Sequence, residues 1–187
     1  MKSIIRNDAE VRALLAGATA LLLPMKPQPI GAEGFRYYPV KPYSSGDVIA
    51  VKEAWAVIDG DYGSGVLYRA DRSMQGIGAE GSSRKGNYRE FLLGDTGDDP
   101  RDVPKPERWN PAQQMPLEYS RIHLTVVSCA PRKTDSITVA ESETIWGKTK
   151  YKAFDALDEL HGHWTARYPK HPWGSWAWRI TVEVKTI

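Results

Sequence analysis

The chain has little cysteine and no long apolar run, and each shortage excludes a class of protein. The single Cys129 rules out an internal disulfide and is compatible with a reducing compartment. No run approaches the roughly 20 apolar residues that a membrane-spanning helix needs. The N-terminal MKSIIRNDAEVR becomes polar too early for a secretory signal. We therefore predict a cytoplasmic protein that does not enter a membrane.

An excess of charge is also missing. The formal net charge is +2, so any basic surface that binds nucleic acid must be local. What the chain does have is enough apolar sequence, 41% of 187 residues, to build the core of one domain. It also has tryptophan concentrated near its end, because five of the seven tryptophans follow residue 145: Trp146, Trp164, Trp173, Trp176 and Trp178.

Sequence motifs for cofactors and metals are weak. GIGAEG at 76–81 resembles a dinucleotide-binding loop but does not lie between a strand and a helix. The HGHW segment at 161–164, with His171 beyond it, has no cysteine or carboxylate partner at zinc-ligand spacing. We read these histidines as surface or helix-terminal residues, and Cys129 as a small buried side chain. The sequence therefore predicts no metal and no cofactor.

The first 30 residues predict a short helix and a buried strand. Asn7 or Asp8 can cap a helix over residues 8–16, and Gly17 is a suitable stop. The apolar run 18–23 follows as a strand candidate. Three prolines at 24, 27 and 29 are expected to prevent regular pairing after it.

The rest of the chain predicts mostly strands. Alternating or apolar patterns indicate strands at 48–57, 66–70, 121–129 and 175–187, and a helix at 151–161. Residues 71–107, rich in Gly, Ser, Asp, Arg and Pro, read as a long loop insertion. Because helices do not separate the strands regularly, the pattern argues against a doubly wound sheet. We predict a single α+β, mainly β domain over 1–187: a small, partly closed barrel with peripheral helices.

Glu53 is the most informative polar residue in these strands. An unbroken strand at 48–57 places it on one face with Val51, Trp55 and Val57. If that face is interior, the carboxylate either pairs with an arginine such as Arg69 or Arg121, or faces a ligand. Trp55 and Tyr68 nearby could stack on a base, although aromatic residues on strands more often belong to the core.

Several segments in a fixed order resemble one family. They are KPQP at 26–29, PYSSGDVIAVKEAWAV at 42–57, LYRAD at 67–71, RWNPAQQMPLEYSRIHLTVV at 108–127 and the terminal PWGSWAWRITVEVKTI. Together they resemble the phage and prophage proteins of the ASCH superfamily, which have a PUA-like barrel. The resemblance covers most of the chain and thins at 71–107 and 134–170. It implies a compact barrel that binds RNA or modified bases in a cleft, in the host cytoplasm if the protein is phage-encoded.

The resemblance also implies an activity to consider. Some small members are amidohydrolases on acylated cytidine nucleosides and use a Lys and a Thr from a GRKTxTxR segment with a downstream Glu. Here Gly17 is followed by ATALLL, so Thr19 has no neighbouring lysine. Glu141 and Glu143 fall in the region of the downstream Glu, but neither matches its position without a gap. Alanine or leucine cannot replace a proton-shuttling amine, so we expect that this site has been lost.

Three functions follow as alternatives. The first is binding of RNA, single-stranded nucleic acid or a nucleotide-like ligand in the barrel cleft, with cations for phosphate and aromatic rings for stacking. The candidate ligand-contacting residues are Lys26, Gln28, Lys52, Glu53, Trp55, Tyr68, Arg69 and Arg121. The second is an amidohydrolase with a rearranged site, for which Lys26, Glu53 and Thr19 are the catalytic candidates. The third is a phage accessory protein that binds a host protein.

Overall fold

The computed structural model describes residues 1–26, 40–60, 63–77, 106–146 and 153–187. By its internal contacts the chain divides into two compact units. The first unit is Met1–Lys2, Arg12–Ala50 and Arg121–Ile187, and the second is Ser3–Val11 and Val51–Ser120. The described residues contain more strand than helix in two sheets, which confirms the α+β class, and neither sheet closes into a barrel. The single-domain assignment stays a prediction.

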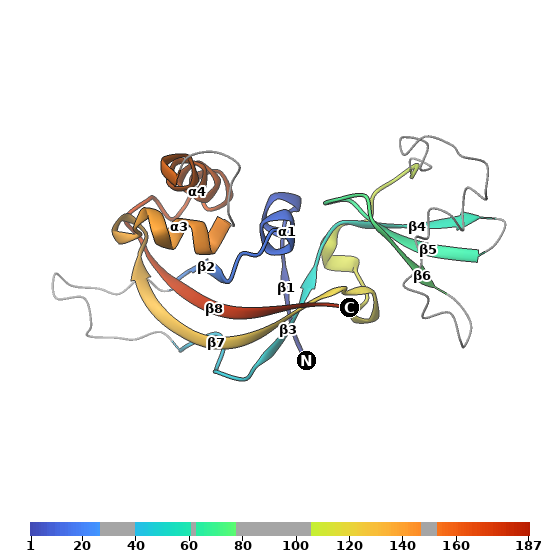
Figure 1. The fold of residues 1–187 in the computed structure, drawn as a ribbon, viewed down its shortest axis with the longest axis horizontal. Coiled ribbons are helices and arrows are strands. Elements are labelled where there is room, and N and C mark those ends of the chain that lie inside the picture. Colours follow the sequence, from blue (N-terminus) through green and yellow to red (C-terminus); the bar gives the residue numbers. More distant parts are fainter. Residues whose placement is uncertain (27–39, 61–62, 78–105, 147–152) are drawn as a thin grey trace. The chain divides into compact units, whose positions relative to one another are not determined.

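The larger sheet has five strands in the order β1-β3-β7-β8-β2 (Figure 1). Their bounds are β1 Lys2–Ile5, β2 Ala20–Pro24, β3 Val48–Lys52, β7 Ile122–Lys133 and β8 Trp176–Thr186. β7 pairs antiparallel with β3 and β8, and β8 with β2. The strands predicted at 18–23, 121–129 and 175–187 are therefore confirmed. Pro24 is part of β2, opposite Ala177, so the prediction that it prevents pairing is wrong. A proline is tolerated there because β2 is an edge strand.

A β-bulge divides β7 into two parts, and the residues that point to the buried face of the sheet fall at even positions before it and at odd positions after it. Before the bulge, Ile122, Leu124 and Val126 are buried, as the alternation predicts. The register with β8 shifts between Val126 and Ser128. Beyond it Cys129 is buried, whereas Ser128 and Ala130 are exposed. A bulge adds one residue to a strand, and the alternation of faces therefore restarts after it.

α1 Asp8–Leu15 confirms the first predicted helix. Its N-terminus is a capping box: the Glu10 N–H donates to Asn7 Oδ1, and the Asn7 N–H donates to Glu10 Oε2, both at 3.0 Å. Gly17 has a φ of +96° after the helix, a conformation that glycine adopts without strain.

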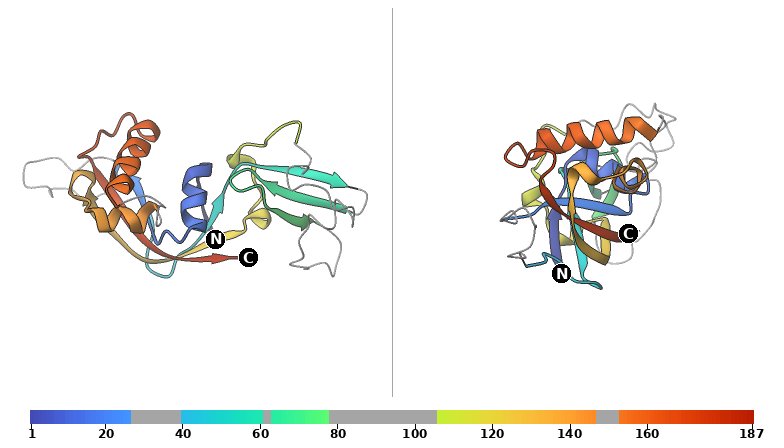
Figure 2. Two further views of the ribbon diagram at one scale, coloured as in Figure 1. Left: turned by 45° about the horizontal axis from the view of Figure 1, so that its top comes forward. Right: turned by 90° about the vertical axis from the view of Figure 1, so that its left-hand side faces the viewer.

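Two further helices pack against the larger sheet. α3 Val139–Trp146 and α4 Ala153–Arg167 lie on the same side of β2 and β8 (Figures 1 and 2). A shared apolar cluster joins them to these strands: Ala20, Leu22, Ile137, Ile145, Leu160, Trp164 and Ala177. The helix predicted at 151–161 is confirmed over its described part and continues to Arg167, which places HGHW inside a helix.

The smaller sheet belongs to the second unit and is a meander of β4 Trp55–Gly60, β5 Gly63–Tyr68 and β6 Met74–Ile77. The unbroken strand predicted at 48–57 is wrong, because β3 ends at Lys52 and β4 begins at Trp55. Val57 is 42% exposed, whereas Val51 and Glu53 are fully buried, so these residues do not share one buried face. The prediction of a loop over 71–107 is wrong at Met74–Ile77, because these residues form β6. Residues 78–105 of that prediction lie outside the described part of the chain.

Candidate functional site

In the second unit, Glu53 lies in the two-residue break between β3 and β4 and is completely buried. The WNPAQQMPLEYS segment supplies hydrogen bonds at this break. The Glu53 N–H donates to the Met115 sulfur at 3.4 Å, and Ser120 Oγ donates to the Val51 carbonyl at 2.9 Å. The two backbone bonds between Trp55 and Asn110 hold the start of β4 in the same way. The motif that carries the family resemblance thus has a structural role in this unit.

Trp55 and Tyr68 are core residues of the second unit, with exposures of 9% and 1%. They form a cluster with Val66 and Met115, and the Trp55 ring meets the Tyr119 ring edge-on at 5.4 Å. The Tyr68 hydroxyl lies 2.8 Å from the Tyr119 carbonyl oxygen, to which it can donate. Neither ring is exposed enough to stack on a base in this structure, so their contact with a ligand stays a prediction.

Arg69 and Lys52 complete the predicted residues of the second unit. Arg69 Nε forms an ion pair with Asp8 Oδ2 at 2.7 Å, with side-chain exposures of 43% and 25%. The Lys52 side chain is half-buried, and its carbonyl accepts from the Arg6 N–H at 2.9 Å. Arg69 thus anchors the beginning of α1, which gives it a structural role.

The first unit contains Thr19, Lys26 and Arg121. Thr19 is exposed; its N–H donates to the Thr144 carbonyl, and its own carbonyl accepts from Val182, both at 2.8 Å. Lys26 is exposed, and Arg121 is buried at 8%. Gln28 lies outside the described residues. Of the catalytic candidates, Thr19 and Lys26 therefore belong to the first unit and Glu53 to the second. Their roles stay predictions.

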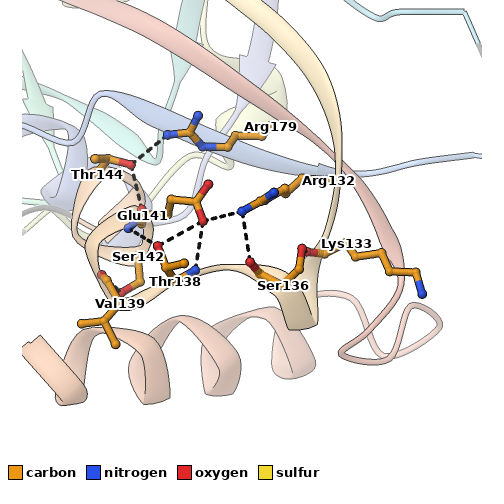
Figure 3. A network of polar contacts seen from close by, with 9 residues as sticks. All are labelled: Arg132, Lys133, Ser136, Thr138, Val139, Glu141, Ser142, Thr144 and Arg179. Carbon is orange, nitrogen blue, oxygen red and sulfur yellow. Dashed lines mark hydrogen bonds and ion pairs between the residues drawn. The ribbon is translucent and has the colours of Figure 1, made fainter.

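Thr144, whose carbonyl accepts the Thr19 N–H, belongs to a polar network around the start of α3 (Figure 3). Glu141 Oε2 accepts from the Thr138 N–H at 3.0 Å, and the Glu141 N–H donates to Thr138 Oγ1 at 3.2 Å, which makes a second capping box. Arg132 Nη2 donates to the same Glu141 oxygen at 2.8 Å and to the Ser136 carbonyl at 3.1 Å. Glu141, which lies in the region of the downstream Glu of the resemblance, thus uses its carboxylate to stabilise the start of α3.

The electrostatics of Glu141 agree with this structural role. Burial raises the pKa of its carboxyl, but the Thr138 N–H and the Arg132 guanidinium lower it more, and the net pKa lies below the ordinary value of 4.5. A carboxylate that is held ionised by hydrogen bonds and a cation is a poor general base at neutral pH.

A second polar surface lies where β2 and β7 end and β8 begins, and most of it was not predicted from the sequence. Lys133 and Trp176 are cross-strand partners, and the Lys133 ammonium lies 5.8 Å from the centre of the Trp176 ring. The Met25 N–H donates to the Trp176 carbonyl at 3.1 Å, which brings Lys26 to this end. Lys26 also lowers the pKa of the His171 imidazole, after a larger effect of burial. We call these four residues the Trp176 surface: Lys26, Lys133, His171 and Trp176.

The Trp176 surface combines exposed cations with aromatic rings. Lys26 and Lys133 are exposed, while His171 and Trp176 are half-buried. Asp135 is a carboxylate near this end, because its Oδ2 lies 3.4 Å from the position that a Cβ on Gly174 would take. The clustering of tryptophans after residue 145 was the available signal for this surface, but it did not show which rings are exposed.

The described residues offer neither a metal cluster nor a membrane-spanning helix. They include no group of three or more His, Cys, Asp and Glu side chains placed to hold a metal ion. No helix among them is long and apolar enough to cross a membrane. Comparisons with known protein families, with curated proteins and with solved structures find no match.

Proposed function

We propose that the protein binds RNA, single-stranded nucleic acid or a nucleotide-like ligand, and that the Trp176 surface makes the contact. The observation that supports this is the Lys133 ammonium over the Trp176 ring. The Met25–Trp176 backbone bond brings Lys26 to the same end, and His171 lies within reach of the Lys26 charge. Ligands of this class present phosphates to cations and flat bases to aromatic rings. The resemblance to the ASCH superfamily, whose PUA-like barrels bind RNA or modified bases, supports the same ligand class.

The surface suits single strands better than duplexes. Bases in a duplex are stacked on each other and offer no free face, whereas a splayed base can lie on a tryptophan or histidine ring. Lysine ammonium groups on flexible stems contact phosphates without reading sequence. We therefore expect affinity that depends strongly on salt and weakly on sequence.

The test is a tryptophan-fluorescence titration with a single-stranded RNA at several salt concentrations. Wild-type protein should bind, and Lys133→Ala should weaken binding and reduce the salt slope by about one unit per lost phosphate contact. Lys2→Ala is the matched control, because Lys2 is also an exposed lysine over an aromatic ring, 5.4 Å from the centre of Tyr43. It should bind like the wild type.

Two results would contradict the proposal. Equal weakening by Lys2→Ala and Lys133→Ala would mean that only overall charge matters. Absence of binding to RNA, single-stranded DNA and nucleotides would remove the function altogether. The hydrolase alternative makes a different prediction, turnover of N4-acetylcytidine by the wild-type protein, and the same samples can be assayed for it.

A further inference from the structure

Arg179 on β8 is a half-buried arginine without a carboxylate partner among the described residues. Its Nη2 donates to Thr144 Oγ1 at 3.3 Å, a long bond to a neutral group (Figure 3). Its Nε is buried and has no hydrogen-bond partner. A partly desolvated guanidinium in this condition is unfavourable unless an anion or water completes its bonds.

The strand pairing leaves one side of Arg179 open. Arg179 lies between Leu22 of β2 and Ala130 of β7 in the sheet. Leu22 is buried in the cluster beneath α3 and α4, whereas Ala130 is exposed. The next pair on the same face is Ser128 and Thr181, which are exposed and half-buried. Ala130 is small and exposed and Arg179 is only half-buried, so we expect a ligand to reach the more exposed part of the guanidinium from the β7 side.

The charges on this face favour an anion. Arg132 lies on the same face, because its partner Ala177 is two residues from Arg179 on β8. Glu141 offsets the charge of Arg132, and its Oε2 is occupied by Arg132 and Thr138. The next acidic side chain along this face of β8 is Glu183, about 13 Å away on an extended strand. The Arg179 guanidinium therefore forms no ion pair among the described residues, and it lies beside the exposed Ala130.

We propose that Arg179, together with the hydroxyls of Thr181 and Ser128, binds the phosphate group of a small ligand. A guanidinium offers a planar set of donors that matches phosphate oxygens, and hydroxyls add neutral donors at its edge. The permanent charge of arginine makes this a binding site and not an acid or base. The site lies on the opposite face of the sheet from Lys133 and Trp176, so it goes beyond the proposed function and can be tested separately.

The experiment follows the thermal melting of the full-length protein in increasing inorganic phosphate, against chloride at equal ionic strength. A ligand that binds only the folded state raises the melting temperature with its concentration. Wild-type protein should show this rise, Arg179→Met should lose it, and Arg179→Lys should retain part of it. Arg167→Met is the control, because it removes one positive charge from α4 and should leave the rise unchanged.

Further ligands identify the source of the phosphate. A nucleoside monophosphate that stabilises more than phosphate alone, while its unphosphorylated nucleoside does not stabilise, would point to a nucleotide. Equal effects of nucleotide and phosphate would point to the free anion. The proposal is overturned if phosphate compounds leave the wild-type melting temperature unchanged, or if Arg179→Met, folded by circular dichroism, keeps the full rise. Neither result bears on RNA binding at the Trp176 surface.

Discussion

The first turns of α1 and α3 are both stabilised by a capping box, but one is buried and the other is partly exposed. Each begins with a capping box whose glutamate also binds an arginine from outside the helix: Glu10 binds Arg6, and Glu141 binds Arg132, both at 2.8 Å. The Arg6–Glu10 side chains are 2% and 10% exposed, whereas the Arg132–Glu141 side chains are 38% and 24% exposed. Similar capping patterns are therefore expected to contribute different energies, because the second pair is more exposed to water.

The buried Arg6–Glu10 pair also leaves more of its arginine nitrogens without hydrogen bonds. Arg6 Nε and Nη2 are buried without hydrogen-bond partners, so Glu10 is the only carboxylate that neutralises this guanidinium in the described residues. In the exposed pair, the arginine also reaches the Ser136 carbonyl. The comparison shows that a capping motif read from sequence locates a helix start but does not give its contribution to stability.

The largest effect is expected for Glu10→Gln. Glutamine can keep the capping bonds but leaves the buried Arg6 charge without compensation, which typically costs about 3–5 kcal/mol. The corresponding Glu141→Gln change should cost about 1 kcal/mol or less, because that pair is partly solvated. Urea denaturation of both variants measures the difference. Equal losses would show that burial does not separate the two sites.

An intermediate effect is expected from acid. The folded-state pKa of Glu141 lies below 4.5, so this group adds stability above that pH and loses it as the pH falls through the folded-state pKa. In Glu141→Gln, the decline of the unfolding free energy below pH 4.5 should be shallower than in the wild type. An unchanged acid profile in Glu141→Gln would contradict this assignment.

Removing the hydroxyl of the same capping box with Thr138→Ala should cost about 1 kcal/mol of unfolding free energy at neutral pH.

The smallest effect is expected for an exposed ion pair that belongs to no capping box. Lys2 Nζ lies 2.7 Å from Asp47 Oδ2, and its hydrogen bond is the main cause that lowers the pKa of that carboxyl. Lys2→Met should raise the Asp47 pKa toward its ordinary value, as NMR titration can follow. The accompanying loss of stability should be smaller than for either glutamate variant. A larger loss would mean that exposure is a poor guide to the value of these pairs.

The sequence predicted the structure correctly where a local capping signal or a regular alternation determines it. Asn7 and Gly17 mark the ends of α1, and the alternation of Ile122, Leu124 and Val126 identifies the buried face of β7. These features depend on local hydrogen bonds or on a regular period, both of which are visible in a single sequence.

The failures have a common physical reason, which is that distant segments decide the local structure. The apparent strand at 48–57 is interrupted at Glu53, where Met115 and Ser120 bind the backbone from more than sixty residues away. The polar surface at the strand ends was missed because it requires the pairing of β7 with β8 and the return of β2. The candidate ring Trp55 was judged from its type, whereas packing against Tyr119 decides its exposure.

Pro24 has a consequence for how copies of this protein meet. β1 and β2 are the two outer strands of the larger sheet as described, and an outer strand can recruit a strand from another molecule. Proline has no N–H to offer such a strand, and Lys2 places a charge on the opposite edge. Both outer strands thus carry a feature that opposes pairing with another molecule. Replacing Pro24 with a β-branched residue should therefore extend the exposed edge and promote aggregation.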